Sequence, residues 1–190
     1  MRSLEVVLNG ALLCRAGIEN ALMYSLDLGV SLDGESPAYV SVSGMHELPD
    51  GEKIQVRWAD FYPLASGDHL ALTLVESKQP TPVAETNEAD TSDPDWQDDS
   101  EVSCGDAQEA TASPWKYIQV RCSVNGELKA EAEISSGEAH LTGSLRWNQW
   151  HPDRCRVAVH SCLQAGAPDT DWLKADLAIN DCLEFQIQSA

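Results

Sequence analysis

The chain has 190 residues and a formal net charge of −19, from 12 Lys and Arg side chains against 31 Asp and Glu side chains. A protein this acidic repels nucleic acid and anionic membranes, so neither is an expected partner and basic protein surfaces are favoured. The same charge is also typical of a protein that simply needs to stay soluble.

The N-terminal residues and the cysteines indicate a compartment. Residues 1–5 begin no apolar run of signal-peptide length, and no stretch approaches the roughly 20 apolar residues that span a bilayer. We therefore expect a cytoplasmic protein, in which the six cysteines are reduced thiols rather than a disulfide framework.

Charge divides the chain into three parts. Residues 79–114, hereafter the acidic run, contain ten acids, four prolines and no Lys or Arg. Residues 1–78 carry 5 basic and 11 acidic side chains, and residues 115–190 carry 7 and 10. More than half of the excess negative charge thus lies in the middle. The sequence predicts a β domain over 1–78, a flexible acidic linker over 79–114 and a second β domain over 115–190.

Alternating apolar and polar residues predict antiparallel strands in the first segment. Two such runs flank Asn9-Gly10, which predicts a hairpin. The apolar residues of both runs can share one face only if the connection has one residue more than the two-residue Asn9-Gly10 loop. We therefore expect a three-residue loop with a bulge instead of a plain type I′ turn. The clearest strand follows, with apolar residues at even positions: Leu22, Tyr24, Leu26, Leu28, Val30 and Leu32.

Further strands are predicted in both segments, and no helical period of useful length appears. In the first segment they lie near residues 38–42, 54–58 and 70–74, between turns at 34–37, 49–51 and 66–68. The predicted fold class is all-β, with a small antiparallel sandwich or open barrel in each segment.

The second segment aligns with the first, which predicts an internal duplication. An offset of 116 places Asn125-Gly126 on Asn9-Gly10, together with the strands that flank each turn. Offsets of 119, 117 and 113 align the later strands in the same order. The alignment fails around residues 59–65 and 165–177. Divergent loops between matched strands are places where function is acquired, and one of them holds Phe61-Tyr62-Pro63.

Catalytic and metal-binding patterns do not emerge from the sequence. Cys155, His160 and Cys162 lie near His151, but Cys155 points to the opposite face of a strand from the other two, and tetrahedral zinc needs four convergent ligands. There is no Gly-x-Ser-x-Gly elbow and no Gly-rich phosphate loop. We expect no metal, no cofactor and no enzymatic activity. A hydrolase whose carboxylates meet only in three dimensions is the least favoured alternative.

Two tryptophans outside the predicted core are candidates for partner binding. Trp150 follows a strand, next to His151 and Asp153; it is either an interface anchor or a cover for the end of the sandwich. Trp96 stands among four aspartates in the acidic run, which suits a tether or, less well, a linear motif that folds onto a basic partner. The candidate partner-binding residues are Asp93, Asp95, Trp96, Asp98, Asp99, Trp150, His151 and Asp153.

The function that these features predict is non-enzymatic protein binding. Small size, strong acidity and the absence of a catalytic pattern favour a cytosolic immunity protein that neutralises a basic bacterial toxin or effector. The alternative is a structural adaptor or assembly chaperone that uses two like domains to bridge two copies of a partner.

Overall fold

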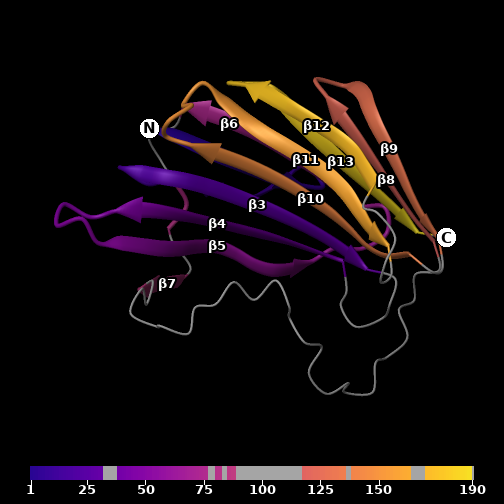
Figure 1. Ribbon diagram of the computed structural model, residues 1–190, viewed down its shortest axis with the longest axis horizontal. Helices are drawn as coiled ribbons and strands as arrows, with labels where there is room; N and C mark the ends of the chain where they lie inside the picture. The colour runs from indigo at the N-terminus through magenta and orange to yellow at the C-terminus, as the bar shows by residue number, and fades with distance from the viewer. Residues whose placement is uncertain are drawn as a thin grey trace, which may run out of the picture.

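The fold is all-β, as predicted. The computed structural model describes residues 1–31, 38–76, 80–82, 85–88, 117–135, 138–163 and 170–189, and every regular element in these ranges is a strand. The strands form two antiparallel sheets, which lie one over the other in Figure 1. Among these residues there is no helix that is long and apolar enough to cross a membrane.

The described residues form thirteen strands in chain order. They are β1 (Arg2–Leu8), β2 (Ala11–Ala16), β3 (Ala21–Ser31), β4 (Tyr39–Glu47), β5 (Lys53–Pro63), β6 (His69–Glu76), β7 (Glu85–Glu88), β8 (Tyr117–Val124), β9 (Glu127–Ser135), β10 (Glu138–Asn148), β11 (Arg154–Leu163), β12 (Thr170–Ala178) and β13 (Cys182–Ser189).

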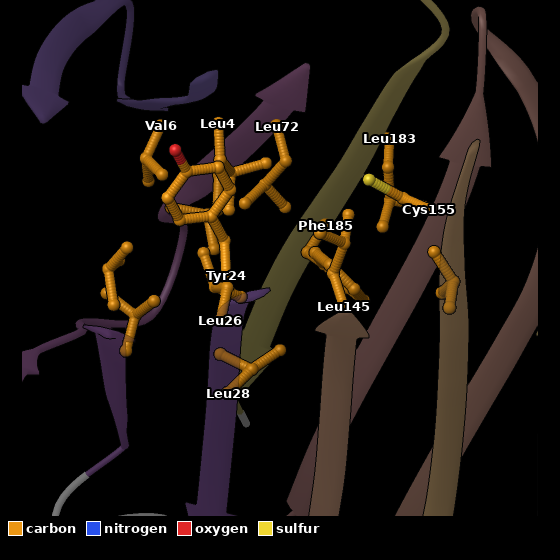
Figure 2. Close-up of a cluster of buried hydrophobic side chains, with 14 of the residues drawn as sticks. Leu4, Val6, Tyr24, Leu26, Leu28, Leu72, Leu145, Cys155, Leu183 and Phe185 are labelled. Atoms are coloured by element: carbon orange, nitrogen blue, oxygen red, sulfur yellow. The ribbon is translucent and has the colours of Figure 1, made fainter. Parts of the chain in front are cut away.

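Both sheets contain strands from both halves of the chain. The six-stranded sheet has the order β2-β1-β6-β13-β8-β9, and the seven-stranded sheet has the order β12-β11-β10-β3-β4-β5-β7. The halves therefore pair edge to edge twice, β6 with β13 and β3 with β10. A single buried cluster spans the two halves, and Figure 2 shows part of it, from Leu4 and Leu26 to Leu145 and Phe185.

The alternation of apolar residues explains which side chains enter this core. In β3, Tyr24, Leu26 and Leu28 are buried to 1% exposure or less, while Met23 and Asp27 are partly exposed on the outer face. In β10, Leu145 and Trp147 follow the same rule. Period-two burial is expected where one face of a sheet packs and the other meets water.

The strand pairing between the halves agrees with the offsets in the sequence. Leu26 lies opposite Leu145, which are 119 residues apart, and Ala71 lies opposite Glu184, which are 113 residues apart. At each of these two junctions a residue therefore faces its own counterpart in the alignment. Two like units related by a twofold axis would pair in this way.

The hairpin loop is shorter than predicted. Leu8 lies opposite Ala11, so the connection is the two-residue turn Asn9-Gly10, with φ values of 52° and 79° that fit a type I′ turn. The predicted three-residue loop is therefore wrong. The extra residue that parity requires sits instead in β2, as a bulge: Val6 faces Cys14, and Val7 already faces Leu12. A bulge inside a strand restores the inward face as well as one in the loop does.

Both Asn-Gly turns are held by the same hydrogen bonds. The Asn9 side chain donates to the Asp68 carboxylate at 2.8 Å and accepts from the His69 backbone at 2.9 Å. Asn125 makes the equivalent bonds with Asp181, at 2.8 Å, and Cys182, at 2.9 Å. Each aspartate also accepts from a backbone amide three residues before it. Each network ties a hairpin turn to the start of the last strand of its half.

One side of the sandwich is closed by the residues after β6. Thr81 donates its backbone N–H to the Arg15 carbonyl at 2.9 Å, and its hydroxyl accepts the Arg15 N–H at 2.8 Å. Its carbonyl accepts from the Trp58 indole at 3.3 Å. Thr81 thus links β2 of one sheet to β5 of the other, and the chain then adds β7 to the edge of β5.

Candidate protein-binding surface

The turn between β10 and β11 presents Trp150 to solvent on a fixed backbone. The side-chain oxygen of Asn148 accepts the N–H groups of Trp150 and His151 at 3.2 and 3.1 Å. The Gln149 N–H donates to the Leu22 carbonyl of β3 at 3.0 Å. These bonds occupy the backbone N–H groups of residues 149–151, while Trp150 stays 70% exposed.

The neighbouring tryptophan is buried and braces the same turn. Trp147 is 5% exposed and stacks on Tyr24, with ring centroids 5.0 Å apart. Its indole N–H donates to the Pro152 carbonyl at 3.2 Å, across the turn. Trp147 therefore belongs to the core. Trp150 does not cover the end of the sandwich, because most of its surface remains in water.

The structure brings three of the eight predicted partner-binding residues together. Trp150, His151 and Asp153 are all exposed on this one turn. The other five, Asp93, Asp95, Trp96, Asp98 and Asp99, lie outside the described residues.

Three arginines beside the turn were missed by the sequence interpretation. Arg146, Arg154 and Arg156 occupy outward positions of β10 and β11, between inward residues such as Trp147 and Cys155. Their alternation with buried residues could have revealed them as one face. We call these three residues the arginine face. Asp176 pairs with two of them, Arg154 and Arg156.

Exposed aromatic side chains also gather at the opposite end of the seven-stranded sheet. Phe61 is 63% exposed with a φ of 41°, and its ring lies 4.8 Å from that of Tyr39. Tyr62 is 42% exposed beside it. A positive φ is uncommon for a bulky residue and marks a strained position. Here it coincides with an irregularity in the pairing of β4 with β5, where two residues of β5 face one of β4.

A shallow polar depression lies on the outer face of the six-stranded sheet. It has a volume of about 290 Å³, and His69, Arg121, Glu184 and Leu128 are among its lining residues. The His69 imidazole lies 3.3 Å from the Glu184 carboxylate, and both side chains are partly exposed. A His–Glu pair can exchange a proton with a bound group. Among the described residues no hydrogen bond joins this pair to a nucleophile, so it supports no specific reaction.

The described cysteines do not offer reactive thiols in the core. Burial raises the pKa of Cys14, Cys122 and Cys155 from 9.0 to about 12 each. Thiolate is the nucleophilic form, so these three side chains act as small core residues at neutral pH. Within the described ranges, no group of three or more His, Cys, Asp or Glu side chains could hold a metal ion.

Comparison with known proteins identifies no relative of the chain. No protein-family model, no curated protein and no solved structure matches the chain.

Proposed function

We propose that this is a non-enzymatic protein-binding protein, a cytoplasmic immunity protein that neutralises a basic bacterial toxin or effector. The observation that carries the binding role is Trp150, 70% exposed on a turn in which the backbone N–H groups of residues 149–151 are hydrogen-bonded. Tryptophan is enriched among the residues that dominate binding energy, and a rigid anchor loses little entropy on binding.

The charge supports a basic partner. A net charge of −19 accelerates the encounter with a cationic surface, and the ten acids of residues 79–114 concentrate that effect in one segment. In this proposal Asp93, Asp95, Asp98 and Asp99 steer the partner, with Trp96 among them. Trp150, His151 and Asp153 form the contact that persists after the encounter.

We also propose that residues 1–78 and 115–190 are two copies of one β unit and that residues 79–114 connect them. The support is the twofold agreement between alignment and strand pairing at Leu26–Leu145 and at Ala71–Glu184. The identical hydrogen-bond networks around Asn9 and Asn125 add to it.

A pull-down from the native host tests the function. Wild-type chain should retain one basic protein, and Trp150→Ala should lose most of it while folding normally. Phe61→Ala, which removes another exposed aromatic ring from the far end of the same sheet, is the matched control and should retain the partner. Equal capture by all three proteins, or capture of no basic protein, would refute the proposal.

Association kinetics test the role of the acids. Replacing Asp93, Asp95, Asp98 and Asp99 with Asn should slow binding to the captured partner and flatten its dependence on salt, because steering is electrostatic. The dissociation rate should change little. Unchanged association would show that the segment only joins the two halves.

The twofold relation favours one second candidate, an adaptor that bridges two copies of a partner. Two like halves offer two like surfaces. The stoichiometry of the purified complex separates the candidates: one partner per chain supports inhibition, and two supports the adaptor.

A further inference from the structure

The arginine face carries more positive charge than its neighbours neutralise. Arg146 on β10 lies directly opposite Arg156 on β11, and like charges in such a cross-strand pair are destabilising. One carboxylate serves the group: Asp176 lies 2.9 Å from Arg154 and 3.8 Å from Arg156. Within the described ranges Arg146 has no ion pair. The three arginines therefore share one ion-paired carboxylate.

The face is exposed at Arg146 and Arg156 and is continuous with a row of polar residues across the sheet. The Arg156 side chain is 76% exposed. Strand pairing places Arg146 beside Ser25, Ser25 beside Ser43, and Ser43 beside Arg57, in one row across four strands. The two serines between the arginines have short side chains, and Ser25 is 8% exposed, so neighbouring side chains already cover part of this row.

The same row leads to the start of the acidic part of the chain. Glu85 of β7 lies opposite Arg57, at one end of the row, and Glu88, the last residue of β7, lies opposite Ile54. Ile54 in turn faces His46 and then Ala21, at the end of the sheet where Gln149 bonds to Leu22. The chain thus leaves β7 at the end of the sheet that carries Trp150. In Figure 1 β7 lies below β5, on the outer side of the strand series.

The distance from β7 to the arginines is within reach of the next residues. Four strand spacings separate β7 from β10, or about 19 Å, and five separate it from β11, or about 24 Å. Seven extended residues, from Glu88 to Asp95, span up to about 24 Å, and eleven, to Asp99, about 37 Å. The eighteen residues from Asp99 to Tyr117 leave ample length for the return to β8.

We propose that the acidic run of this chain docks on the arginine face, with the carboxylates of residues 93–99 paired with Arg146, Arg154 and Arg156. The acidic run is the most acidic segment of the chain, and the arginine face is a cationic surface of the same molecule. Because the two are covalently connected, the carboxylates are present at an effective concentration on the order of millimolar. A free polyanion would have to bind against a net charge of −19 and displace the tethered acids.

Under the proposed function, the arginine face and the basic partner compete for the carboxylates of residues 93–99. A basic toxin would have to draw the same carboxylates away from the arginines, so the apparent affinity is lowered by the free energy of docking. The docking itself needs no partner, so it is tested on the isolated chain.

Zero-length cross-linking with a carbodiimide, which joins amines to carboxylates, is the direct test. The full chain with Arg146→Lys and Arg156→Lys keeps the charge of the face and introduces reactive amines. Peptide mapping of the monomeric product should join positions 146 or 156 to residues 93–99. These links should disappear at about 1 M NaCl, where the screening length is about 3 Å.

Two controls make the result specific. Arg121→Lys places the same amine on the outer face of the other sheet, next to Glu131, and should link to Glu131 rather than to residues 93–99. Replacing Asp93, Asp95, Asp98 and Asp99 with Asn should remove their links from positions 146 and 156 and leave those to Asp176.

Three outcomes overturn the proposal: no link from positions 146 and 156 to the acidic run, equal links from position 121, or links found only in a dimeric product, which would assign the face to a second copy. None of them bears on the pull-down, and a failed pull-down leaves the cross-links unaffected.

Discussion

Trp147 is buried and Trp150 is exposed, although they lie three residues apart. We therefore expect Trp147 to contribute to folding stability and Trp150 to contribute to binding. Trp147 is 5% exposed and packed on Tyr24, whereas Trp150 is 70% exposed. We expect Trp147→Ala to lower the free energy of unfolding by about 3–5 kcal/mol. Trp150→Ala should change it by no more than about 0.5 kcal/mol. Urea unfolding of both variants measures the difference, and a large loss for Trp150→Ala would show that the turn is part of the fold.

The buried thiols predict how stability depends on pH. Cys14, Cys122 and Cys155 have a pKa of about 12 in the folded protein, against 9.0 ordinarily. Above about pH 9 the thiols of the unfolded chain lose their protons, while those of the folded chain keep them. This ionisation stabilises the unfolded state relative to the folded state. The contribution of these three thiols to the free energy of unfolding should therefore be constant below pH 9 and should fall between pH 9 and 12.

A matched variant checks this assignment. Combined Cys→Ala substitution at the three positions should flatten the alkaline fall in the unfolding midpoint, at the cost of smaller side chains in the core. A fall of unchanged steepness would assign it to other groups, among which Tyr24 is the first, since burial also raises its pKa.

At the scale of elements, the two Asn-Gly turns should contribute equally to stability. Asn9 and Asn125 share the same backbone conformation, with φ of 52°, and the same bonds to Asp68 and Asp181. Asn20 also has a positive φ, of 62°, so Asn20→Ala is a control for backbone strain alone. Asn9→Ala and Asn125→Ala should each cost about 1 kcal/mol more than the control, for the lost side-chain bonds.

Thermal unfolding of the three variants provides the measurement. A loss at one Asn-Gly turn that is much greater than at the other would mean that the two networks, although alike in geometry, are not equivalent in the folded molecule.

The strands could be predicted because burial on one face imposes a period of two. Leu22 to Leu28 show this most clearly, and parity also required an extra residue near Asn9-Gly10. The position of that residue could not be deduced, because a bulge in β2 and a longer loop restore the same face. The local pattern carries no information on where the chain prefers the irregularity.

The sequence did not predict how the two halves pair or that three arginines form one face, because alternation does not give the register between strands. Alternation shows that Leu26 and Leu145 point inward, but it does not show that one faces the other across β3 and β10. Likewise Arg146, Arg154 and Arg156 are only outward residues until the register of β10 and β11 brings them together. Trp150 was found because an aromatic residue in a polar turn is conspicuous without any register.

At the scale of the whole molecule, strand pairing across the halves should make unfolding cooperative. Leu26 and Leu145 are 0% and 1% exposed and lie opposite each other. Each Leu→Ala substitution should cost about 2–5 kcal/mol, and the double variant should deviate from additivity because the two side chains share a site.

Unfolding followed by two probes tests the cooperativity. The fluorescence of the tryptophans and the far-ultraviolet dichroism of the strands should give one coincident transition in the wild type and in each variant. Two separate transitions, of which each variant lowers only its own, would show that residues 1–78 and 115–190 fold as independent domains.

Under the proposed duplication, the junction of β3 with β10 would lie on the axis that relates the two copies. In a dimer of identical subunits, two positions related by the symmetry axis would have to form the same pair. Here Tyr24 faces Trp147, while Leu28 faces Gly143, although the offset of 119 makes Leu28 the counterpart of Trp147 and Tyr24 that of Gly143. One site holds two rings and the other a leucine above a glycine. If the halves are the two copies that we propose, fusion into one chain releases such sites from self-complementarity, so that each half can evolve a shape that only the other half fits.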